Sequence, residues 1–126
     1  MKFICFGYLD VQSWSKKSVS EQNAMIDQCF TYDDVLKKNG HWAGGEGLQG
    51  ATTLSHQKGK VTVTDGPYAE SKELLGGLLI LEAKDLQHAI QLISNHPGMK
   101  MGRWEIRPAA DLAPMIQESE RRRAKS

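Results

Sequence analysis

The stretch VTVTDGPYAESKELLGGLLILEA, from Val61 to Ala83, decides the fold of this chain. It begins with alternating β-branched residues, breaks at Asp65-Gly66-Pro67, crosses a polar segment, and becomes almost entirely apolar from Leu74 to Leu81. This succession predicts a strand, a sharp turn and then a buried strand. Loops held by a rigid scaffold often carry binding groups, so the polar turn is where we first expect chemistry.

The residues before this stretch predict a strand, a helix and an irregular strand. Residues 2–8 form an apolar and aromatic run that suits a strand. Ser18-Val19-Ser20-Glu21 has the form of a capping box, and apolar residues at helical spacing follow it as far as the stop at Lys37-Lys38-Asn39-Gly40. Three glycines within residues 41–48 indicate a bulged strand that something approaches closely.

A hairpin and a second half of the domain complete the pattern. Residues 51–57 and 60–64 flank the turn Lys58-Gly59, and the alternation of the second segment predicts one buried face. Asp85 caps a second helix that ends before Pro97, and residues 103–108 alternate as a half-buried last strand. We expect a domain over residues 1–108 and a frayed, solvated tail over residues 109–126. The alternative for the tail is that its basic end binds an acidic partner.

The order of these elements, β-α-β-(hairpin)-β-α-β, is that of a split βαβ, ferredoxin-like α+β domain. Such a domain has an antiparallel sheet with both helices on one face, to which this chain adds a β-hairpin. The other face of the sheet stays uncovered. Exposing a large apolar face is unfavourable, so we expect a homodimer formed through the sheet face, with clefts along its edge.

Composition excludes several classes of protein. The 126 residues are 40% hydrophobic and 25% charged, which is ordinary for a single globular domain. A net charge of +1 argues against nucleic-acid binding, and no apolar run approaches the length of a membrane span. Cys5 and Cys29 lie in apolar surroundings and are interpreted as buried free thiols in a reducing compartment. We therefore expect a cytoplasmic protein.

Four motifs in order resemble the YCII-related family, in particular its DGPF-domain branch: Gly44 to Leu48, Val63 to Glu73, Leu75 to Gly77, and Glu105 to Pro108. The similarity covers about Lys2 to Pro108, and Tyr68 stands where the branch has its signature phenylalanine. The resemblance implies a dimeric α/β barrel and an active-site cleft around the DGP turn. It also implies that some relatives act as lyase-like enzymes on small chlorinated or aromatic acids, and that some members occur beside extracytoplasmic-function sigma factors.

Asp65 is the leading candidate for catalysis. A carboxylate at the end of a strand, shielded by Pro67 and Tyr68, is suited to act as a general acid or base. The alternative is an Asx-turn, in which the same carboxylate accepts backbone N–H groups from Gly66 onward. Both interpretations stay open, and one side chain can serve both uses.

Other polar residues are weaker candidates. His96 is a second catalytic candidate, although before Pro97 it also suits the end of a helix. The candidates for ligand binding are Tyr68, Glu46, Ser71, Lys72 and Arg107. Loop solvation, a bulge and a cross-strand charge ladder are the structural alternatives for them. The spacing of His, Cys and acidic residues indicates no metal site, and we expect no cofactor.

Two hypotheses for function follow. The first is a small-molecule-binding protein or a lyase- or hydrolase-like enzyme that uses Asp65 for proton transfer in a cleft of the homodimer. The second is a non-catalytic accessory module that binds a protein partner such as a sigma factor.

Overall fold

The computed structural model describes residues 1–67 and 72–125. In chain order the elements are β1 (Lys2–Asp10), α1 (Val11–Ser15), α2 (Val19–Lys38), β2 (Trp42–Gly47), β3 (Thr52–Gln57), β4 (Lys60–Asp65), β5 (Glu73–Glu82), α3 (Leu86–Ser94), the 3₁₀ helix η1 (Pro97–Lys100), β6 (Trp104–Pro108) and α4 (Ala113–Ala124). Among these described helices, none has both the length and the apolar character that crossing a membrane requires.

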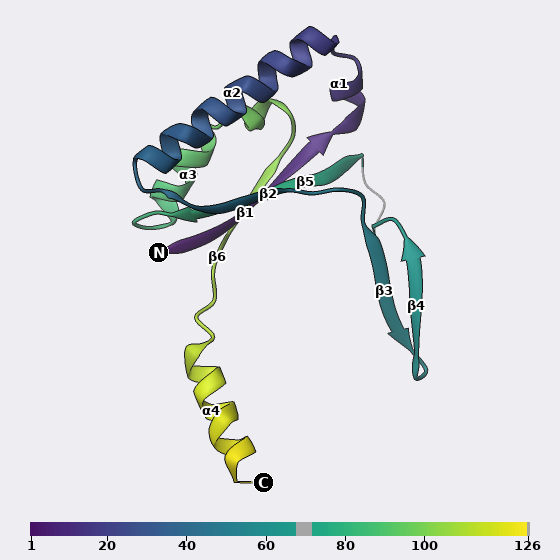
Figure 1. Ribbon diagram of the computed structural model, residues 1–126, viewed down its shortest axis with the longest axis vertical. Coiled ribbons are helices and arrows are strands. Elements are labelled where there is room, and N and C mark those ends of the chain that lie inside the picture. Colours follow the sequence, from purple (N-terminus) through teal and green to yellow (C-terminus); the bar gives the residue numbers. More distant parts are fainter. Residues whose placement is uncertain (68–71, 126) are drawn as a thin grey trace.

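Four strands form one antiparallel sheet in the order β2-β5-β1-β6. Helices α2 and α3 lie on the same side of this sheet, as Figure 1 shows. This is the ferredoxin-like α+β arrangement predicted from the sequence, with helices on one face and β3–β4 as a separate two-stranded sheet.

The core lies between the sheet and the two helices. Phe3 faces Leu81 across β1 and β5, Cys5 faces Leu79, and all four side chains are buried. They pack with Leu36, Ala83, Ala89 and Ile93. Since side chains alternate along a strand, Ile4, Phe6, Leu78 and Ile80 lie on the opposite face, which we call the open face.

Local signals fix the helix boundaries. The Ser18 hydroxyl accepts the Glu21 N–H at 3.1 Å, and the Glu21 carboxylate accepts the Ser18 N–H at 3.0 Å, which confirms the predicted capping box. The Ser18 N–H, and after it the Ser18 hydroxyl, stabilise the charged carboxylate and lower the pKa of Glu21. Asp85 caps α3 in the same manner, by accepting the His88 N–H at 2.8 Å.

The hairpin β3–β4 forms as predicted, but the expected burial of one of its faces is wrong for the single chain. Lys58 and Gly59 both have positive φ, at 51° and 77°, which suits a two-residue turn. All six residues of β4 are exposed. The reason is that, in the part of the chain that the structure describes, β3 and β4 pair only with each other and stand away from the main sheet (Figure 1).

The tail also differs from the frayed terminus that we expected, because residues 113–124 form helix α4. Proline in its first turn, followed by good helix formers, favours this conformation. An ion pair of 2.8 Å between Arg121 and Glu118 adds a contact one turn apart. None of its residues is buried, so α4 makes little contact with the core.

Candidate active site

A row of glycines opens a space between the sheet and α2. Pairing places Gly47 opposite Gly77, Gly77 opposite Gly7, and Gly7 opposite Trp104. All four lie on the helix-facing side, in the layer next to the Cys5 and Leu79 core. Three of these positions have no side chain, so the floor of this space is backbone, which the Trp104 ring covers at Gly7. We call Gly47, Gly77 and Gly7 the glycine row.

The result is a cleft of about 610 Å³ between α2 and the sheet. Its helical wall comes from one face of α2, which includes Ile26, Cys29, Phe30, Asp33 and Lys37. Two indoles border the floor. Trp42 lies so close to Gly45 that a Cβ there would come within 2.5 Å of the ring, and Trp104 lies 3.0 Å from a Cβ built on Gly7. Glycine at both positions is required for this close approach.

Asp33 and His96 form a hydrogen-bonded pair at the wall of the cleft. His96 Nε2 lies 2.9 Å from Asp33 Oδ1, and His96 Nδ1 accepts the Gly98 N–H at 2.9 Å. Because Gly98 occupies Nδ1 as a donor, Nε2 carries the ring proton and donates it to Asp33. The His96 side chain is 5% exposed and that of Asp33 is 16% exposed. The imidazole is therefore fixed, and the carboxylate keeps limited access to the cleft.

Asp33 Oδ2 accepts no hydrogen bond among the described residues, so one carboxylate oxygen is left for a ligand. Two aromatic contacts hold the imidazole in place, since Tyr32 lies 5.3 Å and Trp104 5.0 Å from its ring centroid. The histidine thus orients the carboxylate of Asp33, and both residues line the cleft.

The other polar groups of the cleft have distinct roles. Burial, followed by the negative charge of Asp33, raises the pKa of the Cys29 thiol, which keeps it protonated and a poor nucleophile. Lys37 Nζ lies 4.8 Å from the centre of the Trp42 ring and 3.9 Å from Asp34 Oδ1. It brings a cation to the end of the cleft, where an anionic ligand gains from it.

Trp104 contributes a hydrogen-bond donor without an acceptor. Its Nε1 is buried, and it makes no hydrogen bond within the described ranges 1–67 and 72–125. An unsatisfied buried N–H costs about 1–3 kcal/mol. Trp104 lines the cleft with other atoms of its ring, whereas Nε1 itself is closed off from the open space.

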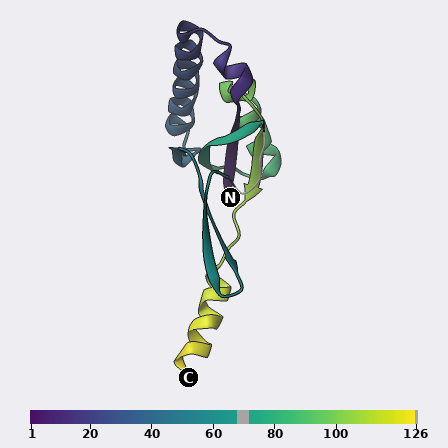
Figure 2. The ribbon, with the colours of Figure 1, turned by 90° about the vertical axis from the view of Figure 1, so that its right-hand side faces the viewer.

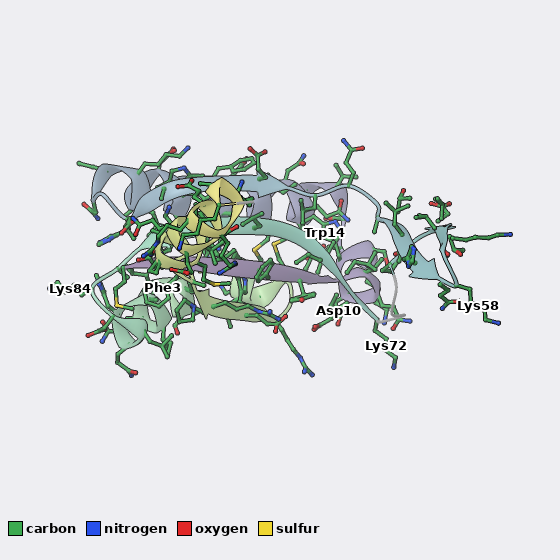
Figure 3. The ribbon with its side chains drawn as sticks, turned by 90° about the horizontal axis from the view of Figure 1, so that it is seen from below. Phe3, Asp10, Trp14, Lys58, Lys72 and Lys84 are labelled. Atoms are coloured by element: carbon green, nitrogen blue, oxygen red, sulfur yellow. The ribbon has the colours of Figure 1, made fainter. Side chains whose placement is uncertain are left out.

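The structure brings two of the sequence-predicted residues to this cleft and leaves others elsewhere. Glu46 and His96 line it. Asp65 is exposed at the end of β4 and Lys72 is exposed near the base of the hairpin, where Figure 3 labels it, and neither lines the cleft. Arg107 lies on β6 with its guanidinium 5.5 Å from the Phe6 ring centre, on the open face. Tyr68 and Ser71 lie outside the described residues, and the roles assigned to all of these residues stay predictions.

Sequence reasoning missed Asp33 and the glycine row. Asp33 continues the spacing of Ile26, Cys29 and Phe30 on an otherwise apolar helical stripe, and a carboxylate in such a stripe is the signal that could have found it. The row depends on strand register, which the single glycines do not specify. No group of three or more His, Cys, Asp or Glu side chains is placed to hold a metal ion in the described part of the chain.

Fold and cleft together define an α+β protein with a small-molecule-sized site. The chain belongs to the family of the YCII-related domain, whose model matches residues 1–113. An uncharacterized protein of Rhizobium meliloti (strain 1021) is 35% identical over 66 residues, which are 51% of this chain and 53% of that protein. The match thus spans about half the length of this curated relative.

A solved structure supports the fold. The 5-chloro-2-hydroxyhydroquinone dehydrochlorinase TftG from Burkholderia phenoliruptrix AC1100, in complex with 2,5-dihydroxybenzoquinone, aligns with a TM-score of 0.52 at 17% sequence identity. The alignment covers 87% of this chain and 94% of TftG. At this identity the likeness concerns the fold alone.

Proposed function

We propose that the cleft binds a small, flat, oxygen-bearing molecule and that Asp33 transfers a proton to or from it. The observation that carries the proposal is the largely buried pair of Asp33 and His96 in the cleft lining, in which only one carboxylate oxygen of Asp33 is bonded to the histidine. His96 serves as a positioning residue, because both of its ring nitrogens are occupied, by Asp33 and by the N–H of Gly98.

The shape of the cleft favours a planar ligand. Backbone without side chains at Gly47 and Gly77 offers a flat floor, and the indoles of Trp42 and Trp104 add aromatic surface at its border. Lys37, at the border of the cleft, suits negative charge on the oxygen atoms of the ligand. Hydroxylated quinones and hydroquinones combine these properties.

The reaction class proposed is a lyase-type elimination. Loss of hydrogen halide requires a base that takes a proton while the halide leaves with the electron pair of its bond to carbon. Asp33 is the base suited to this step, and the donated Nε2–H of His96 holds its carboxylate in orientation. The dehydrochlorinase activity named for TftG, a protein of similar fold, supports this choice of class.

The test compares carboxylate variants of the full chain. Binding of 2,5-dihydroxybenzoquinone is measured by calorimetry, and release of chloride is measured from 5-chloro-2-hydroxyhydroquinone. We expect Asp33→Asn to lower turnover by about 100-fold or more, the usual size of a general-base effect. Asp27→Asn is the matched control, because Asp27 lies on the same helix, is exposed and does not line the cleft.

Asp65→Asn separates this proposal from the hypothesis that we drew from the sequence. Turnover that is lost in Asp65→Asn and kept in Asp33→Asn would contradict the assignment to Asp33. A wild-type protein that neither binds the quinone nor releases chloride would instead show that the ligand class is wrong.

A further inference from the structure

Two sulfur atoms meet at the helical wall of the cleft. The Cys29 thiol on α2 donates to the Met101 thioether, with 3.8 Å between Sγ and Sδ, and both residues are partly buried and line the cleft. Met101 directly follows η1, which contacts α2. Figure 2 shows α2 at one end of the molecule and α4 at the other, so the projecting tail takes no part in this contact. We call Cys29 and Met101 the sulfur pair.

The sulfur pair lies beside Asp33 and His96. Cys29 precedes Asp33 by one helical turn, and residues with this spacing are neighbours whose Cβ atoms lie about 5–6 Å apart. Met101 is connected to the histidine through the backbone, because its N–H donates to the Gly98 carbonyl at 3.0 Å and the Gly98 N–H donates to His96 Nδ1 at 2.9 Å. A six-membered ring that contacts Asp33 therefore brings a neighbouring substituent within reach of the two sulfurs.

The contact between the two sulfurs is weak and adaptable. A thiol is a weak donor and a thioether is a weak acceptor, so a ligand atom can replace this hydrogen bond at little cost. The methionine side chain has three rotatable bonds and fills irregular spaces, which lets Met101 adjust to a substituent. The sulfur pair is thus suited to receive one atom of a ligand, in contrast to the fixed pair of Asp33 and His96.

The chemistry of the sulfur pair favours a large, polarizable substituent. Thiol and thioether sulfur are soft and polarizable, as chlorine and bromine are. A strong hydrogen-bond acceptor gains little here, because the thiol is the one donor of the pair and a weak one. Burial, followed by the negative charge of Asp33, raises the pKa of the Cys29 thiol, so the thiol keeps the proton that it donates.

We propose that the sulfur pair is the subsite for a chlorine or bromine substituent of the ligand. This inference rests on the function proposed for the cleft, and it names the atoms that recognise the leaving group. As Asp33 takes a proton from the ligand, the carbon–halogen bond breaks and the halogen leaves as halide with both electrons of that bond. The Cys29 S–H turns from Met101 to the halide and keeps its own proton. Asp33 becomes neutral as it takes the proton, so it does not repel the anion that forms beside it.

The test measures affinity by calorimetry with two ligands that share one core. These are 2,5-dihydroxybenzoquinone and its 3,6-dichloro derivative, both of which are ionised at neutral pH. The wild-type chain is expected to bind the dichloro ligand about tenfold more tightly or better, because a group the size of a methylene in a fitting pocket is worth roughly 10–200-fold.

Two variants remove the sulfurs one at a time. Met101→Leu nearly conserves volume, and Cys29→Ala removes the thiol. We expect each to reduce the preference for the dichloro ligand to within about threefold, with little change in affinity for the unchlorinated ligand. Met99→Leu and Gln28→Ala are the matched controls, which keep the full preference, because both residues are exposed and neither lines the cleft. Far-UV circular dichroism verifies that each variant stays folded.

The outcomes separate this inference from the function proposed for the cleft. A wild-type chain that binds both ligands equally would overturn the subsite and leave that function standing, whereas one that binds neither ligand would contradict both. A preference that survives in Met101→Leu and in Cys29→Ala would place the halogen elsewhere.

Anomalous scattering locates the substituent directly in crystals grown with the 3,6-dibromo derivative. One bromine atom in contact with Met101 Sδ supports the proposal. Bromine atoms that both lie away from the sulfur pair overturn it.

Discussion

His96 Nε2 lies 2.9 Å from Asp33 Oδ1, and this bond joins the middle of α2 to the segment between α3 and η1, 63 residues further along the chain. The contact therefore fixes the helical wall of the cleft to its far side. Because both side chains are largely withdrawn from water, the pair contributes to stability as well as to the site.

His96→Asn is expected to lower the free energy of unfolding by about 2–4 kcal/mol, because it leaves a carboxylate that is largely buried without its donor. Urea denaturation of His96→Asn, Asp33→Asn and the double variant checks this. Since the two residues share one bond, the double variant is expected to lose less than the sum of the single losses. If the loss of unfolding free energy in the double variant equals the sum of the losses in the two single variants, the two side chains are not coupled.

A large side chain in the glycine row is expected to weaken ligand binding while leaving the stability of the fold unchanged. A Cβ built on Gly47 meets nothing within 4 Å, so Gly47→Leu has room to fold, yet its side chain occupies the cleft. We expect its unfolding midpoint to stay near that of the wild type and quinone affinity to fall at least tenfold. Gly50→Leu is the control, because it has the same free space outside the cleft. Equal affinity in the two variants would place the ligand elsewhere.

The buried thiol of Cys5 makes stability depend on alkaline pH. Burial raises the pKa of Cys5 from an ordinary 9.0 to about 11. Between these values the unfolded chain loses the proton while the folded chain keeps it, so the free energy of unfolding falls as pH rises. The loss amounts to about 2–3 kcal/mol across the window, and below pH 9 the contribution is constant.

Cys5→Ala tests this dependence, since it removes the titrating group. We compare the slopes of unfolding free energy against pH between 9 and 11, not the absolute stabilities, because the substitution also leaves a cavity. A variant whose slope equals that of the wild type would contradict the assignment to Cys5.

The capping box of α2 contributes measurably to the free energy of unfolding. Ser18→Ala removes the acceptor of the Glu21 N–H and is expected to cost about 0.5–2 kcal/mol. Ser20→Ala, two residues along and inside the helix, is expected to be neutral or slightly stabilising. Thermal unfolding, monitored by circular dichroism, distinguishes the two variants. An unfolding midpoint that is unchanged in Ser18→Ala would contradict a stabilising role for the capping box.

Features that depend on neighbouring residues could be predicted from the sequence. The Ser18–Glu21 box, the Lys58-Gly59 turn and the Asp85 cap each involve residues within a few positions, and all three are confirmed. The order of strands and helices then constrained the sheet to the ferredoxin-like arrangement.

The site was harder to predict because its parts meet only through tertiary structure. Asp33 meets His96 from 63 residues away, and the glycine row requires the register of three strands. The alternation of Val61 and Val63 indicated a buried face, but periodicity does not say whether the cover comes from the same chain. Asp65, whose role stays a prediction, belongs to that projecting hairpin.

Amide chemical-shift mapping with 2,5-dihydroxybenzoquinone tests the central claim most directly, because it locates the ligand without reference to activity. We predict that the largest shifts on titration occur at Gly7, Gly47 and Gly77 and at the Trp104 indole N–H. Shifts confined to the hairpin residues 52–65, with the glycine row unchanged, would contradict the assignment of the cleft as the ligand site.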